Sequence, residues 1–127
     1  MGIAPVSWWL MQALGVARRT EPLAISPLLM IVIVNPVLEE IVFRGGVQDW
    51  LQGRRALRHR WGPLSLANVL TSLLFASVHL LRQPPLWAAL TFLPSLIFGW
   101  AKERHETLLS PIVLHMSYNA GFIWLFA

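Results

Sequence analysis

Long apolar segments, separated by short polar corners, are the feature that most limits how this chain can fold. The segment from about Ala24 to Phe43 has the roughly 20 apolar residues that a helix needs to cross a bilayer. Four further segments are also apolar, although the first of them is shorter. They run from about Ile3 to Ala17, Pro63 to Leu81, Leu86 to Ala101 and Leu108 to Ala127.

Composition indicates why these segments belong in a membrane. Hydrophobic residues make up 56% of the 127 residues and charged residues only 13%, whereas a soluble domain carries roughly 25% charged residues. A water-soluble chain of this length could not bury that much apolar surface. We therefore predict an all-α, polytopic membrane helical bundle, with one domain over residues 1–127 and about four or five hydrophobic helices.

Two local features refine this expectation. After Phe43, apolar side chains recur at about helical spacing among charged residues, which predicts a further helix lying along the membrane interface. Within the fourth apolar segment, Pro94 predicts a kink, because proline cannot donate the helical hydrogen bond.

The charged residues and the absence of cysteine exclude several classes of function. Without cysteine, the chain has no disulfide, thiol nucleophile or thiolate metal site. The net charge of +4 is concentrated in one polar stretch between apolar segments, which is typical of a loop beside membrane spans. We therefore expect a lipid bilayer, and no nucleic acid, as a partner. The residues of this stretch are Arg54, Arg55, Arg58 and Arg60.

Ionisable residues within apolar segments are costly and usually mark function. Glu40 and Arg44 are four residues apart, so on a helix they share a face and can pair. Glu39 points about a quarter-turn away and lacks that local partner, which suits a general base. The spacing predicts a structural Glu40 and a chemical Glu39. The alternative is that both carboxylates belong to a structural ion cluster.

Two other apolar segments contribute histidines. His79 follows Phe75 by four residues, and Asn119 follows His115 by four, so each pair shares a helix face. His115 and Asn119 could both donate hydrogen bonds to the negative oxygen of a tetrahedral intermediate. Taken singly, each histidine could instead make a polar contact between helices.

Combined in one cavity, these groups could hydrolyse an amide bond without a covalent nucleophile. Glu39 would act as general base, His79 would orient the water, and His115 and Asn119 would hold the oxyanion. Two non-catalytic readings stay open. In one, the polar residues only join the helices of a membrane scaffold; in the other, Glu39 and His79 form a proton relay in a carrier.

Two alternative chemistries use the same residues. Glu39, His79 and His115 are good zinc ligands, although the helical pattern of two histidines flanking a glutamate is absent. Ser77 and Ser117 each lie two residues from a histidine, which places them on a different helix face and argues against a serine nucleophile.

Three motifs in order resemble a known family. EEIVFR (Glu39–Arg44), FASVH (Phe75–His79) and HMSYN (His115–Asn119) are similar to the EExxxR, FxxxH and HxxxN patterns of the CPBP intramembrane proteases. That family includes the CAAX-processing, Rce1-like endopeptidases and the bacterial Abi proteins. The resemblance covers about Pro36 to Phe122 and implies an all-helical intramembrane endopeptidase, of glutamate-dependent or metalloprotease type.

The resemblance also implies roles for single residues. Glu39 and His79 would activate the hydrolytic water, and His115 and Asn119 would form the oxyanion site. Glu40 and Arg44, together with Phe75 of the second motif, would support the site.

Further expectations concern the surroundings of the site. The resemblance implies a membrane-anchored protein or peptide as substrate, zinc as a possible cofactor, and a place in the bacterial plasma membrane. The family also includes bacteriocin-immunity proteins, so a non-catalytic role of that type is the alternative. Only one short apolar segment precedes Glu39, which predicts a minimal or truncated N-terminal region.

Overall fold

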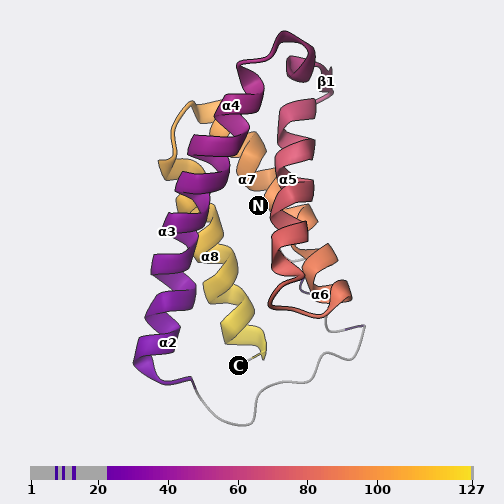
Figure 1. Cartoon of the computed structure of the whole chain (residues 1–127). Coiled ribbons are helices and arrows are strands. Elements are labelled where there is room, and N and C mark those ends of the chain that lie inside the picture. Colours follow the sequence, from indigo (N-terminus) through magenta and orange to yellow (C-terminus); the bar gives the residue numbers. More distant parts are fainter. Residues whose placement is uncertain (1–7, 9, 11–12, 14–22, 127) are drawn as a thin grey trace.

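The structure is a computed structural model that describes residues 8, 10, 13 and 23–126. Most of the predicted first segment, Ile3 to Ala17, lies outside the described residues. One continuous helix, Ile25–Gln52, dominates the fold and contains 28 residues, which corresponds to about 42 Å. Its consecutive parts (Figure 1) are α2 (Ile25–Leu29), η1 (Met30–Val34), α3 (Asn35–Glu40), η2 (Ile41–Gln48) and α4 (Asp49–Gln52).

Wide helical turns allow this helix to pass through a proline. In η1 the N–H of Asn35 bonds to the carbonyl of Met30, five residues earlier. The next donor in that pattern would be residue 36, which is Pro36 and has no N–H. The carbonyl of Ile31 is therefore left for a donor from elsewhere in the protein.

A turn and a hairpin follow the long helix, so the residues after Phe43 do not begin a separate helix. A position of this helical end along the membrane interface stays a prediction. The chain continues η3 (Arg55–Arg58), β1 (Arg60–Trp61) and β2 (Leu64–Ser65), with the strands paired antiparallel. The helical spacing after Phe43 was real, but it belongs to the same long helix, which ends at Gln52. Strands of two residues are too short to produce an alternating pattern, so the sequence did not predict them.

The side chain of Glu103 binds both the hairpin and the end of the long helix. Its carboxylate accepts hydrogen bonds from Gln48 Nε2 at 2.8 Å and Arg60 Nη1 at 3.0 Å, and from Gln52 and the hydroxyl of Ser65. This acceptor therefore holds the end of the long helix in the bundle.

The remaining helices are α5 (Leu66–His79), α6 (Pro85–Leu90), α7 (Phe92–His105) and α8 (Leu109–Phe126). α7 packs against both α5 and α8, and α8 packs against α3 (Figure 1). The predicted kink takes the form of a break in the turn before Pro94, at Thr91 between α6 and α7. Pro94 lies in the first turn of α7, where a missing N–H breaks no helical bond.

α5 and α7 approach closely because one position has no side chain. A Cβ on Gly99 would lie 1.9 Å from Oδ1 of Asn68, which no other residue could tolerate. Asn68 Nδ2 donates to the carbonyl of Leu96 on the same helix as Gly99, at 2.8 Å. The buried amide thus joins the two helices where they touch.

The bundle has polar groups inside and apolar side chains outside. Glu40, Arg44 and Gln48 are fully buried, together with Asn68, Thr71, Ser72 and Ser95. Large apolar side chains are exposed instead, among them Ile25, Leu38, Leu73, Val113 and Trp124. This distribution suits an apolar solvent, in which polar groups must find partners inside the protein.

By length and composition, Ile25–Gln52 can cross a bilayer, and α5 is a shorter apolar helix. Among the described residues no second helix meets both criteria. The mostly helical fold is confirmed, with the small hairpin as an addition. The polytopic arrangement with four or five spans stays a prediction.

Candidate active site

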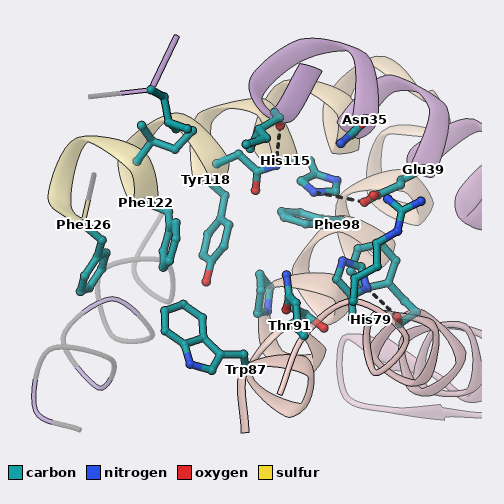
Figure 2. A pocket seen from close by; sticks show the side chains of 18 residues that line it. Asn35, Glu39, His79, Trp87, Thr91, Phe98, His115, Tyr118, Phe122 and Phe126 are labelled. Carbon is teal, nitrogen blue, oxygen red and sulfur yellow. Dashed lines mark hydrogen bonds and ion pairs between the residues drawn. The ribbon is translucent and has the colours of Figure 1, made fainter. Parts of the chain in front are cut away.

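One pocket of about 440 Å³ is lined by Glu39, His79, His115 and Asn119. These side chains come from α3, α5 and α8, so the structure brings together the four residues that the sequence singled out. Figure 2 shows Glu39, His79 and His115 around the same space. The roles assigned to them stay predictions.

Glu40 and Arg44 form the pair that their spacing predicts. Arg44 Nε lies 3.0 Å from Glu40 Oε2, and both side chains are fully buried. Arg44 Nη2 also donates to Ser95, to the carbonyl at 2.9 Å and to the hydroxyl at 2.7 Å. The pair is thereby bound to α7, and neither of its two residues lines the pocket.

His115 lies between the two glutamates. Its Nδ1 is 2.8 Å from Glu40 Oε1, and its Nε2 is 3.7 Å from Glu39 Oε2. Its ring stacks on Phe98, with centroids 4.7 Å apart and planes 18° apart (Figure 2). The Arg44–Glu40 pair therefore holds His115, and His115 in turn faces Glu39.

His79 is oriented by its own helix. Its Nδ1 lies 2.8 Å from the carbonyl of Phe75, and because a carbonyl only accepts, Nδ1 carries the proton in this bond. Nε2 is then the nitrogen left for a ligand. The Phe75 ring contacts His79 at 4.4 Å, His115 at 5.9 Å and the Arg44 guanidinium at 5.6 Å, so it packs against both histidines and the buried arginine.

Asn119 binds the carbonyl that Pro36 leaves free. Its Nδ2 donates to the carbonyl of Ile31 at 2.8 Å, joining α8 to η1. One amide hydrogen and the amide oxygen of Asn119 are not used in that bond. A structural role for Asn119 thus exists beside the predicted oxyanion role.

The predicted metal ligands do not form a ready metal site. Across the described part of the chain, no three His, Cys, Asp or Glu side chains are grouped so that they could hold a metal ion. Nδ1 of each histidine is already bonded within the protein. Zinc at Glu39, His79 and His115 therefore stays a prediction.

The two serines near the histidines are bonded to their own helices. Ser77 Oγ donates to the carbonyl of Leu73 at 2.7 Å, and Ser117 Oγ to that of Val113 at 2.8 Å. Their hydroxyls are exposed, and neither lines the pocket. This geometry agrees with the prediction that neither is a nucleophile.

Sequence reasoning missed Ser95, Phe98 and Asn35. Ser95 anchors Arg44, Phe98 stacks on His115, and Asn35 lines the pocket. Ser95 and Phe98 gave no signal, because small hydroxyls and aromatic rings are common in apolar helices. Asn35 did give one: it is an amide among isoleucines and valines, four residues before Glu39.

Replacing Asn119 should cost stability only while Pro36 is present. Asn119→Ala leaves the Ile31 carbonyl unpaired, so we expect the free energy of unfolding in detergent to fall by ~1–2 kcal/mol. In a Pro36→Ala background, the new N–H of residue 36 can bond to that carbonyl, and the loss from Asn119→Ala should be small. Equal losses in the two backgrounds would contradict this account; Ser117→Ala is the matched control on α8.

The comparisons with known proteins agree with this architecture. The family model of the Rce1-like type II CAAX prenyl endopeptidases matches residues 21–121. An uncharacterized 24.3 kDa protein of Escherichia coli is 37% identical over 100 residues, which cover 79% of this chain and 44% of that protein. The chain thus spans less than half the length of that relative. No solved structure matches significantly.

The family model matches most residues of this chain and includes all three motifs. The chain therefore belongs to the Rce1-like family of type II CAAX prenyl endopeptidases.

Proposed function

We propose that this chain carries the active site of an intramembrane endopeptidase that cleaves a membrane-anchored protein or peptide. The observation that carries the proposal is the meeting of Glu39, His79, His115 and Asn119 in one pocket of a protein whose outer surface is apolar. Membership of the Rce1-like family supports it.

Glu39 is the general base in this proposal. Its side chain is 28% exposed, so it can reach water in the pocket, while Glu40 is enclosed with Arg44. Glu39 takes a proton from a water that His79 Nε2 helps to orient, and the water oxygen attacks the carbonyl carbon of the substrate. When the C–N bond breaks, the proton passes from Glu39 to the leaving amine.

His115 and Asn119 stabilise the negative oxygen of the intermediate. When the His115 ring carries both protons, Nδ1–H donates to Glu40 and Nε2–H is available to the oxyanion. Asn119 contributes its remaining amide hydrogen. Arg44 and a doubly protonated His115 balance the charges of Glu39 and Glu40, which lowers the cost of keeping these groups in a low-dielectric interior.

The apolar outer surface supports a polytopic membrane bundle, and the relative from Escherichia coli supports the bacterial plasma membrane as its place. Exposed apolar side chains lie on the long helix, α5, α7 and α8, for example at Ile33, Leu73, Leu93 and Val113. The pocket would then open to substrates held in the same bilayer. Because the family is named for CAAX prenyl endopeptidases, a prenylated peptide is the first substrate to test.

The purified protein in liposomes should cleave a farnesylated peptide that ends in a CAAX sequence, with release of the C-terminal fragment measured by fluorescence dequenching. Ser77→Ala and Ser117→Ala should cleave at the wild-type rate, since neither hydroxyl takes part. Loss of activity in either variant would favour serine chemistry. Inhibition by a zinc chelator that added zinc reverses would support the zinc site.

The alternative function is a non-catalytic scaffold or an immunity-type membrane protein. In that case the polar residues only hold helices together, and changing any of them should reduce stability. Glu39 separates the two functions best, because its one ionic contact among the described residues is the 3.7 Å approach to His115.

A further inference from the structure

Asn35 lies one helical turn before Glu39 on the same face of α3. Side chains four residues apart on a helix have their Cβ atoms about 5–6 Å apart. Both residues line the pocket, and Figure 2 shows both on the wall that the long helix contributes. Asn35 is therefore close to the reacting centre in the proposed mechanism, although it belongs to none of the three motifs.

The carboxamide of Asn35 has no hydrogen bond to any described residue, which distinguishes it from the two histidines and the second asparagine that line the same pocket. His79, His115 and Asn119 each use one atom to bond within the protein. A carboxamide in an apolar helix costs free energy unless it finds a partner. The side chain is half-buried at the pocket surface, so its donor and acceptor remain available to whatever enters the pocket.

A carboxamide has the same donor and acceptor groups as a peptide bond. It can donate to a main-chain carbonyl and accept from a main-chain N–H at once. Successive Cα atoms of an extended peptide are 3.8 Å apart. If the scissile carbonyl lies beside Glu39, the main chain within about two residues of it passes Asn35.

We propose that Asn35 is a substrate-binding residue whose carboxamide pairs with the main chain of the substrate beside the scissile bond. This inference rests on the proposed peptidase function. It assigns Asn35 a different task from Asn119: Asn119 is bonded to the Ile31 carbonyl, whereas Asn35 lines the pocket without a bond to a described residue. A peptide main chain is the partner because the pocket is otherwise lined mainly by apolar and aromatic side chains.

The test combines an enzyme variant with altered substrate main chains. The protein in liposomes is given the farnesylated CAAX peptide, and then peptides in which one amide near the scissile bond is replaced by an ester, which removes one N–H. We expect Asn35→Leu to lower kcat/KM for the all-amide peptide about 3- to 10-fold. One ester position should lower kcat/KM of the wild-type protein similarly, yet leave that of Asn35→Leu unchanged.

Controls separate binding from folding. Leu38→Ala changes an exposed side chain on the same helix that does not line the pocket, and it should respond to every ester as the wild type does. Asn35→Ala provides a second variant if the leucine form does not fold, and it should show the same insensitivity to that ester. Melting temperatures in detergent identify any variant that has lost its fold.

Two results would overturn the inference in distinguishable ways. If the wild type cleaves the peptide and the Asn35 variants match it for every substrate, Asn35 does not bind the main chain, while the proposed peptidase function stands. If the wild type cleaves none of the peptides, the peptidase function fails, and this inference fails with it.

Discussion

Glu39→Gln is expected to lower kcat by about 100- to 10,000-fold, the usual contribution of a general base, while the protein keeps its fold. Glutamine has nearly the same shape but cannot take a proton from water. Glu39 is partly exposed to the pocket, and its ionic contact is the long 3.7 Å approach to His115. Its charge therefore contributes little to holding the helices, and the melting temperature should change little.

The neighbouring residue is the matched control for this variant. Glu40→Gln alters the same charge in the same helix, but Glu40 is fully buried, pairs with Arg44 and binds His115. Its replacement should reduce stability clearly. Cleavage by Glu39→Gln at the wild-type rate would remove Glu39 from the mechanism, and a large loss of stability in Glu39→Gln would favour the scaffold alternative.

Local helical spacing was enough to predict several features of the site. The Glu40–Arg44 pair and the shared face of Phe75 and His79 follow from a four-residue separation, and both occur. The four pocket residues could be identified from the sequence because polar side chains are rare in apolar segments. The family motifs also contain all four. In each case the information lies within one turn of one helix.

Contacts between helices were not predictable in the same way. The bonds from Glu40 to His115, from Arg44 to Ser95 and from Asn119 to Ile31 join residues 51 to 88 positions apart. No spacing rule gives the rotation of one helix against another. The surroundings of the end of the long helix were not predictable for the same reason, because the bonds that Glu103 makes there come from a distant part of the sequence.

Arg44→Met is expected to lower the free energy of unfolding in detergent by ~3–5 kcal/mol, the usual loss when one member of a buried ion pair is removed. Methionine fills much of the same space, so the main effect is electrostatic. Glu40 remains fully buried without its cation, and Ser95 loses the donor that bonds both its oxygens. Denaturant titration followed by tryptophan fluorescence measures the change.

The double variant Glu40→Gln/Arg44→Met distinguishes charge from packing. It removes both charges, and the amide oxygen of glutamine can still accept from His115 Nδ1, so most of the stability should return. Activity should stay low, because a neutral residue 40 no longer balances the positive charge that His115 carries when both nitrogens donate. A double variant as unstable as Arg44→Met would show that the guanidinium acts through its bonds to Ser95 and its packing on Phe75. A stable double variant with wild-type kcat would show that His115 functions without the carboxylate of Glu40, and the Arg44–Glu40–His115 chain would then only join helices.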